Sequence, residues 1–423
     1  MRKWLWAALL CGVLALVVVS CGGDDDDDGG GGGDAKKAPA VDANAKGDVN
    51  WCIGKDTSGA YGTAIDLFKK ENPKITVKLV ELPTSADEQR AQLVQRLRAK
   101  SDECDVLGMD VVWTAEFAAQ GWLQDTTDII DPRKSDFIAS TLETASYEDK
   151  YWAVPYHTNA GFIYYRKDEV PKLPSSWEDL YAEAGKGNGI VYQGFRYEGL
   201  TVNFLELLYS GGGKVLSDDG KAVEVDSPEA EAALAFMADG IKQGDAPKAV
   251  TTYMEEESRR AFESGNATFM RNWPYAYSLG KESKIANDFD VGTFPSFKGG
   301  DPASVLGGIN LAISAYSKNP DAAAAFIDYA TGEAVEKANF LESASPPASA
   351  AVYDDPQVQK KYAFASDLKA AVEQGQSRPV SPVYSQISEA IYNNVHDALQ
   401  GKAEPKDAVK QMSDDIQKAL ETF

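Results

Sequence analysis

Between residues 49 and 113 the hydrophobic pattern alternates between the periods of strands and helices, and this alternation constrains the fold more than any other feature. The segments "VNWCI", "KITVKLVEL" and "DVLGMDVVW" indicate strands, and each interval between them has the periodicity of a helix. The third segment is apolar apart from its aspartates, as expected of a parallel strand buried on both faces. We therefore expect an α/β fold with a parallel sheet covered by helices.

The predicted helices have apolar faces that indicate how they pack. The second early helix begins at "SADE" (85–88), which predicts a capping box. Further helices are expected from Ser176 onward and at 228–240, 256–264, 320–331 and 405–420. The side chains of the early helices that should face the core are Ala64, Ile65, Phe68, Leu93, Val94 and Leu97. Residues 47–423 exceed what one hydrophobic core usually organises, so we expect two lobes.

The N-terminus has the pattern of an export signal. Arg2 and Lys3 precede an apolar run from Trp4 to Val19, which is shorter than the about 20 residues of a bilayer-spanning helix and fits a secretory signal peptide. "VVSC" then resembles the lipobox of bacterial lipoproteins, which predicts a signal peptide at 1–20 and a lipidated Cys21. An uncleaved anchor helix is the alternative. Both place the body of the protein outside the cytoplasm, anchored to the outer face of the cell membrane or in the periplasm.

A polar segment, "GGDDDDDGGGGGDAKKAPA", follows Cys21. Its low hydrophobicity leaves too little apolar surface to offset the entropy of ordering it. We expect a flexible linker over 21–46, with the roughly 25–30 Å reach of a Gly-rich chain.

Charge and cysteine content limit the partners and cofactors. A net charge of −23 argues against nucleic acid and anionic membrane surfaces as partners. Cys11 lies in the predicted signal peptide, so Cys52 and Cys104 remain as an even pair in an oxidising compartment. A disulfide between them would close a loop of about 50 residues and contribute roughly 4 kcal/mol; two free buried thiols are the alternative. With only two histidines and no CxxC, we expect no metal centre and no cofactor.

The segment "FMRNWPYAYS" places Trp273, Tyr275 and Tyr277 around a proline, directly after Arg271 and Asn272. A buried core is one interpretation, because aromatic side chains dominate cores. A wall for a flat, hydroxylated ligand is the other. Aromatic rings stack on the apolar C–H face of a sugar, while carboxylates, amides and guanidinium groups reach its hydroxyls.

Asp110 interrupts the apolar segment "VLGMDVVW". A lone carboxylate there would be costly unless it accepts hydrogen bonds. Ligands of open α/β sheets bind beyond the carboxyl ends of the strands, close to where Asp110 is expected. Asp110 is therefore a candidate for binding ligand hydroxyls, with capping of the following "TAEFAAQ" helix as the alternative.

Six blocks of sequence, in this order, resemble the extracellular solute-binding proteins (family 1) of carbohydrate ABC importers. They are "DVVWTAEFAAQGWL", "YWAVPYHTNAGFIYYRKDEV", "YQGFRYEGL", "RNWPYAYSL", "GGINLAISAYSKNP" and "SRPVSPVYSQISEAI". The chain is most similar to the trehalose/maltose-binding lipoproteins, over essentially its whole mature length. The resemblance implies a two-lobed periplasmic-binding-protein-like fold (type II), with the ligand cleft between lobes joined by hinge crossings. Lobe 1 would comprise 47–155 plus 305–346, and lobe 2 would comprise 156–304 plus 347–423.

The resemblance also implies the site. The positions that match ligand-binding residues of the family are Asp110, Asn159, Trp273, Tyr275, Gly308 and Arg378. Arg90 and Glu255 match less distinctly, and a solvated helix face is the alternative for each. Tyr277 is assigned to the core.

Three features depart from the maltose-type pattern. His157 stands where a tyrosine is common, and we keep it as a candidate ligand residue. Ile309 replaces a stacking ring, as in the trehalose subgroup. A gap after Gly54 removes the usual site of a glutamate and leaves Lys55, Asp56 and Ser58 there.

Taken together, the resemblance implies a monomeric, lipid-anchored binding component of an ABC sugar importer. Its ligand would be an α-linked disaccharide, with trehalose favoured over maltose, delivered to a membrane permease driven by a cytoplasmic ATPase. A protein that binds another glycoside or a short oligosaccharide is the alternative. A glycoside hydrolase would need two carboxylates about 5–9.5 Å apart across the scissile bond. No hydrolase motif occurs, so we expect no enzyme, and the candidate rings argue against a purely structural surface lipoprotein.

Overall fold

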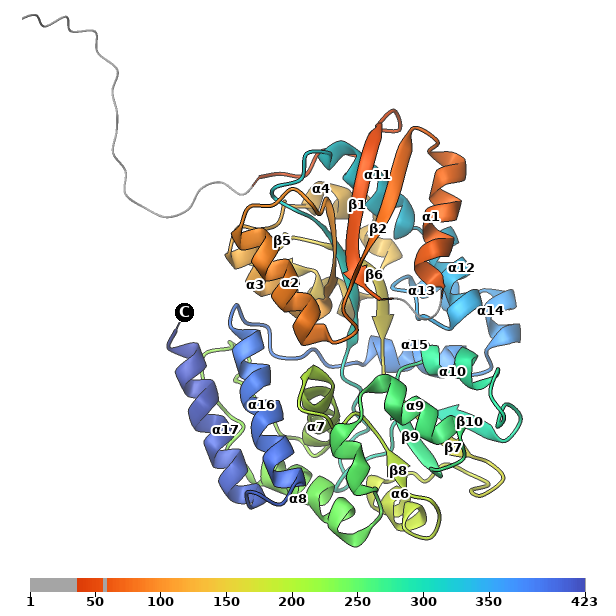
Figure 1. Ribbon diagram of the computed structural model, residues 1–423, viewed down its shortest axis with the longest axis vertical. Helices are drawn as coiled ribbons and strands as arrows, with labels where there is room; N and C mark the ends of the chain where they lie inside the picture. The colour runs from red at the N-terminus through yellow and green to blue at the C-terminus, as the bar shows by residue number, and fades with distance from the viewer. Residues whose placement is uncertain (1–35, 56–58, 423) are drawn as a thin grey trace, which may run out of the picture. The chain divides into compact units, whose positions relative to one another are not determined.

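The computed structural model describes residues 36–55 and 59–422, which belong to one compact unit (Figure 1). The predicted signal peptide at 1–20 and the predicted lipidation site Cys21 lie outside the described residues. Two sheets organise the described chain. In Figure 1, β1, β2 and β6 lie in one half of the ribbon and β7 to β10 lie in the other.

The first sheet has the strand order β2-β1-β3-β11-β6. Its strands are β1 (Gly47–Gly54), β2 (Ile75–Leu82), β3 (Val106–Asp110), β6 (Val154–Asn159) and β11 (Gly307–Ile313). The three predicted strands are confirmed and pair in parallel, β1 lying between β2 and β3. The sheet as a whole is mixed, because β11 inserts antiparallel between β3 and β6. The pattern of the three early strands does not predict β11, which lies about 200 residues later in the sequence, after the second sheet.

The helices around this sheet bury the predicted faces. They are α1 (Ala60–Glu71), α2 (Ala86–Arg98), α3 (Thr114–Ala119), α4 (Thr127–Ile130), α5 (Ala139–Thr144), α11 (Pro320–Ala330) and α12 (Glu333–Ser343). Ala64, Leu93, Val94 and Leu97 are buried, as is Phe68, whose ring meets Phe326 edge-on, whereas Ile65 is half-buried. The predicted capping box is wrong, because the Ser85 side chain makes no cap hydrogen bond.

The second sheet has the order β10-β7-β9-β8. Its strands are β7 (Phe162–Arg166), β8 (Ile190–Val191), β9 (Phe269–Asn272) and β10 (Phe289–Gly292). Nearby helices include α6 (Trp177–Ala184), α7 (Glu198–Ser210), α8 (Pro228–Gln243), α9 (Glu255–Glu263), α10 (Tyr275–Gly280), α16 (Tyr384–Leu399) and α17 (Pro405–Leu420). All the later helices predicted from the sequence are present. The remaining elements are the hairpin β4 (Ser146–Tyr147) and β5 (Lys150–Tyr151), with α13 (Ala350–Tyr353), α14 (Pro356–Lys361) and α15 (Ala365–Glu373).

A disulfide joins Cys52 to Cys104, with Cα atoms 5.7 Å apart. Cys52 lies in β1 and Cys104 immediately precedes β3, the parallel partner of β1. This confirms the predicted pairing over the alternative of two free thiols. The bond joins neighbouring strands that are distant in sequence, so it restricts the unfolded chain.

The described chain passes from one sheet to the other in two places. The first crossing lies between Asn159 of β6 and Phe162 of β7, and the second spans 293–306. The segment that follows α15 runs beside the second crossing. The Leu306 amide donates to the Gln376 carbonyl, and the Gln376 amide donates to Ser304, both at 2.9 Å. The first crossing lies a few residues beyond residue 155, and the proposed lobe ranges otherwise stay predictions.

The end of the predicted linker is attached to the first sheet's side of the molecule. The Ala38 amide donates to the Asp125 carbonyl at 2.8 Å, and the Asp125 amide donates to Lys36 at 2.9 Å. Ala38 and Ala45 bury their methyl groups. Residues 36–46 are therefore part of the folded body, which corrects the expectation of a flexible linker as far as residue 46. Among the described residues, none of the helices is both long and apolar enough to cross a bilayer.

Candidate ligand-binding cleft

A cavity of about 240 Å³ is lined by residues that the two sheets and their helices position. It adjoins a second cavity of about 210 Å³, and six residues line both. The shared residues are Tyr61, Thr84, His157, Asn159, Glu255 and Tyr275. Of the predicted ligand residues, those that line this cleft are Asp110, His157, Asn159, Glu255, Trp273, Tyr275, Gly308 and Arg378.

Arg90 is the predicted residue that the structure does not bring to the cleft. Its guanidinium lies between α2 and α3, where Nε donates to Oε2 of Glu116 at 2.7 Å and Nη2 pairs with the other carboxylate oxygen. Both side chains are largely shielded from solvent. Arg90 therefore holds the two helices together.

The backbone of Trp273 is fixed on both sides. Its amide donates to Oδ1 of Asn272 at 2.8 Å, and its carbonyl accepts from the Tyr164 hydroxyl at 2.7 Å. The Asn272 amide group in turn donates to the Glu255 carbonyl at 3.0 Å. A Cβ on Gly307 would lie 3.0 Å from the indole edge, so glycine there leaves room for the ring. The end of β9 and the start of α10 therefore hold Trp273 at the cleft.

Tyr275 presents its ring to the cleft while its hydroxyl is engaged. The hydroxyl donates to Oε1 of Glu256 at 2.9 Å. Glu256 also accepts from Nη2 of Arg259 at 2.6 Å. Tyr277, by contrast, packs its ring against Phe364, with centroids 4.8 Å apart. Its assignment to the core is therefore confirmed.

Asp110 and Arg378 meet each other at the cleft. Nη2 of Arg378 donates to Oδ1 of Asp110 at 2.7 Å, and Nη1 donates to Oε1 of Glu198 at 2.7 Å. The same Asp110 oxygen accepts from the Val112 amide at 3.2 Å, at the start of a 3₁₀ turn. Asp110 thus caps the 3₁₀ turn after β3 and also lines the cleft. The alternative, in which it caps the helix that begins at Thr114, is wrong, because that helix has no side-chain cap.

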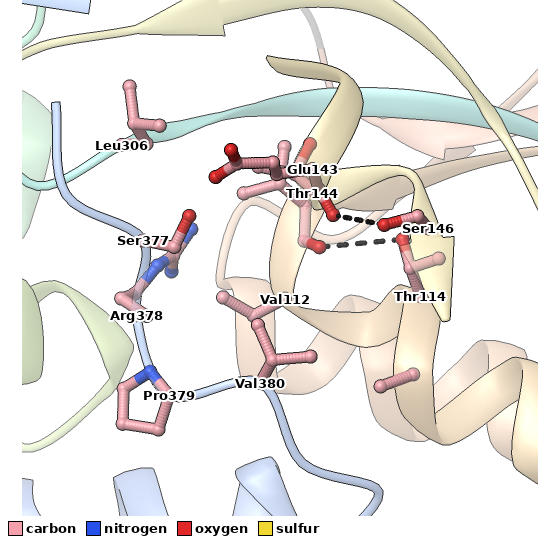
Figure 2. A pocket seen from close by; sticks show the side chains of 12 residues that line it. Val112, Thr114, Glu143, Thr144, Ser146, Leu306, Ser377, Arg378, Pro379 and Val380 are labelled. Atoms are coloured by element: carbon pink, nitrogen blue, oxygen red, sulfur yellow. Dashed lines mark hydrogen bonds between the residues drawn. The ribbon is translucent and has the colours of Figure 1, made fainter. Parts of the chain in front are cut away.

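Arg378 also lines a smaller pocket with Val112, Leu306 and Pro379, on the segment that follows α15 (Figure 2). Figure 2 shows the segment 377–380 running past Val112 and Thr144. Arg378 therefore lies where this segment meets the carboxyl end of β3.

Glu198 is buried at the N-terminus of α7, and its pKa differs from that of an ordinary glutamate. Burial raises its pKa to about 7, and Asp110 adds to the rise while Arg378 opposes it. Its Oε1 also accepts from the Tyr384 hydroxyl at 2.6 Å, and Oε2 accepts from the Ser388 hydroxyl. The Glu198 amide donates to Oδ2 of Asp87 at 3.1 Å, and burial raises the pKa of Asp87 as well. Of these three carboxylates, those of Asp110 and Glu198 bond to the Arg378 guanidinium.

Glu255 is a further carboxyl group of the cleft with a perturbed pKa. Burial raises the pKa of Glu255, and the Tyr197 hydroxyl and Arg271 oppose the rise.

Gly308 has a φ of +120°, and a Cβ there would lie 2.3 Å from the His157 carbonyl oxygen. Only glycine fits this conformation, next to the irregular pairing of β11 with β6.

Sequence reasoning missed Tyr61 and Glu198. The Tyr61 ring, in α1, lies 5.1 Å from the Trp51 ring and lines both cavities. Its position in an amphipathic helix gave no signal of a ligand role. Glu198 lies in "YQGFRYEGL", and an acidic residue beginning a helix is common enough to pass unnoticed.

Lys55 lines the second cavity, while Asp56 and Ser58 lie outside the described residues.

The comparisons with known proteins agree with this geometry. Residues 54–337 match the family model of bacterial extracellular solute-binding proteins. A "Probable ABC transporter-binding protein" of Deinococcus radiodurans is 36% identical over 359 residues, covering 80% of this chain and 85% of that protein.

Two solved structures share the fold. Maltose-bound MalE3 of T. maritima is 35% identical with a TM-score of 0.83, covering 89% of this chain and 99% of that one. The GacH receptor of Streptomyces glaucescens, solved unliganded and with acarbose, is 26% identical with a TM-score of 0.80, covering 90% and 100%. Both confirm the two-lobed α/β fold. The chain therefore belongs to the family of bacterial extracellular solute-binding proteins, and it is a binding protein of the ABC-transporter kind and not an enzyme.

Proposed function

We propose that this solute-binding protein serves an ABC sugar importer and binds an α-linked disaccharide in the cleft. The observation that carries the proposal is the composition of one cavity. It brings the rings of Tyr61, Trp273 and Tyr275 together with the polar groups of Asp110 and Asn159. Rings desolvate the apolar faces of a sugar, and ionised or amide groups replace the water lost from its hydroxyls.

Trehalose and maltose are the two candidate ligands. Ile309, which lines the cleft where a stacking ring would favour maltose, supports trehalose. The maltose bound by the T. maritima neighbour supports maltose. A short oligosaccharide is the alternative, because the adjoining cavity of about 210 Å³ offers room beyond a disaccharide.

Delivery to the membrane completes the proposal. Lipidation of Cys21 would hold a monomer near its permease and raise its effective concentration there. Closure of lobe 1 (47–155 plus 305–346) on lobe 2 (156–304 plus 347–423) would present a state that the permease and its cytoplasmic ATPase recognise. Mass spectrometry of membrane-extracted protein tests the anchor: an acylated N-terminal Cys21 is expected, and a Cys21 without lipid would contradict it.

Titration calorimetry with trehalose, maltose, sucrose and glucose tests the ligand, using wild type and Trp273→Ala. Truncating a ring that stacks on the sugar should cost about 2 kcal/mol, or roughly 30-fold in Kd. Tyr277→Ala is the matched control, because this ring packs in the core and should leave Kd unchanged. A folded wild type that binds none of the four sugars would contradict the proposed ligand class.

A further inference from the structure

The guanidinium of Arg271 covers one face of the Trp273 indole. The Cζ atom of Arg271 lies 4.1 Å from the ring centroid. Arg271 is 1% exposed, whereas Trp273 is half-buried and lines the cleft. Since a flat ring has two faces and Arg271 occupies one, a ligand has the opposite face to stack on.

The guanidinium is fixed in its plane by two partners. Nε donates to Oε2 of Glu206 at 2.9 Å, and Nη2 pairs with the other oxygen of the same carboxylate. Nη1 donates to Oε1 of Gln193 at 2.9 Å, and the Gln193 amide group donates back to the Arg271 carbonyl at 3.1 Å. These bonds engage all three guanidinium nitrogens, and the flat face of the group lies over the Trp273 ring.

The surroundings leave this arrangement little freedom. Glu206 is also 1% exposed. Burial raises its pKa, and Arg271 opposes the rise. A Cβ on Gly161, in the first crossing, would lie 2.8 Å from Nη2 of Arg271. A glycine in the crossing therefore gives the ion pair its space.

We infer that Arg271 is a positioning residue for ligand binding: it holds the Trp273 indole in one orientation, with the uncovered face toward the sugar. This inference rests on the proposed function. A buried ion pair is often no more stable than well-packed apolar residues of the same volume, so fold stability alone does not explain the pair. A pre-positioned ring binds more tightly because the ligand need not order it.

Arginine suits this role better than lysine. Its planar group stacks on an aromatic face while its edge binds a carboxylate, and an ammonium group cannot do both. Arg271→Lys keeps the charge and removes the planar cover. We expect it to weaken Kd for the tightest-binding sugar by about tenfold.

A double-mutant cycle separates positioning from general damage. Once Trp273→Ala has removed the ring, Arg271→Lys should weaken Kd by no more than about twofold further. Arg133→Lys is the matched control. Arg133 also stacks on a ring, that of Phe137 at 5.0 Å, and pairs with Asp328 outside the cleft. The Arg133→Lys variant should have a lower melting temperature than wild type and the same Kd for the sugar.

A second variant covers the case in which Arg271→Lys does not fold. The exchange Arg271→Met with Glu206→Leu removes both charges, leaves none unpaired, and should give the same coupled loss of affinity. The inference would be overturned if a folded variant bound the sugar with a Kd within twofold of that of wild type. It would also be overturned if the change at Arg271 weakened Kd as much in the Trp273→Ala background as it does in wild type. If wild type binds no sugar, the proposed function is overturned and this inference with it, so the two failures are distinguishable.

Discussion

Arg378, which lines the cleft, and Arg271, which stacks on the cleft residue Trp273, are both buried, but their partners differ in number and origin. Arg271 faces one carboxylate, Glu206, which lies on α7 beside the same sheet. Arg378 contacts Glu198 of the second lobe's α7 and Asp110 at the end of β3 in the first sheet. The first pair lies within one lobe and is balanced in charge, while the second joins the two lobes and has an excess of negative charge.

This difference assigns the two sites different physical roles. A buried, charge-balanced pair held by several hydrogen bonds keeps its geometry and is suited to holding a ring in place. At the second site burial raises the pKa of Glu198 to about 7, and the nearby Asp110 carboxylate adds to the rise. Movement of the lobes would also change the second site, because its bonds cross between them.

Breaking the balanced pair should have the largest effect. Glu206→Ala leaves the Arg271 charge buried without a counter-ion, and we expect a loss of about 3–5 kcal/mol in the free energy of unfolding. Urea denaturation measures it. A loss below about 1 kcal/mol would show that solvent or another group reaches Arg271, and the contrast between the two sites would disappear.

The site around Arg378, which has more carboxylates than guanidinium groups, should make the stability of the protein depend on pH. The pKa of Glu198 rises from 4.5 to about 7 on folding, mainly through burial. The folded state therefore binds this proton more tightly than the unfolded state. Its stabilising contribution is complete below about pH 4.5 and is lost as the pH rises to about 7.

Glu198→Gln, which mimics the protonated form, isolates this effect. Relative to the variant, wild type should lose up to about 3 kcal/mol of unfolding free energy across that window. Denaturation at about pH 4.5 and about pH 8 measures the difference. Parallel stability curves for the two proteins would mean that folding does not raise the pKa of Glu198.

Removing a single hydrogen bond to Glu198 should have a smaller effect on stability and should also move its pKa. Ser388→Ala removes the hydroxyl that donates to Glu198 and holds its pKa down. We expect the free energy of unfolding to fall by about 1 kcal/mol. The pH range over which protonated Glu198 loses its stabilising contribution should shift to higher pH. Ser278→Ala, at a half-buried hydroxyl near Tyr362, is the control and should leave the window in place. An unchanged window in Ser388→Ala would remove Ser388 from the account of this pKa.

The sequence predicted local features better than pairings. Strand and helix positions followed from periodicity, so α8, α11 and α17 begin where Pro228, Pro320 and Pro405 indicated. The antiparallel insertion of β11 could not be predicted, because an apolar run does not reveal its neighbours. All the candidate ligand residues except Arg90 line the cleft.

The errors at the site have a common physical cause. Arg90 and Arg378 are the same residue type, and only tertiary contacts show that one pairs with Glu116 away from the cleft. Tyr61 and Glu198 reach the cleft through the packing of α1 and α7, which no local pattern encodes. The roles of Arg271 and Glu206 required the distance between two positions that lie 65 residues apart.

The decisive experiment is a crystal structure with the tightest-binding disaccharide. We expect a sugar ring against the face of Trp273 opposite Arg271, with hydroxyls bonded to Asp110 and Asn159. A sugar bound elsewhere, or bound in the cleft without touching Trp273, would contradict it.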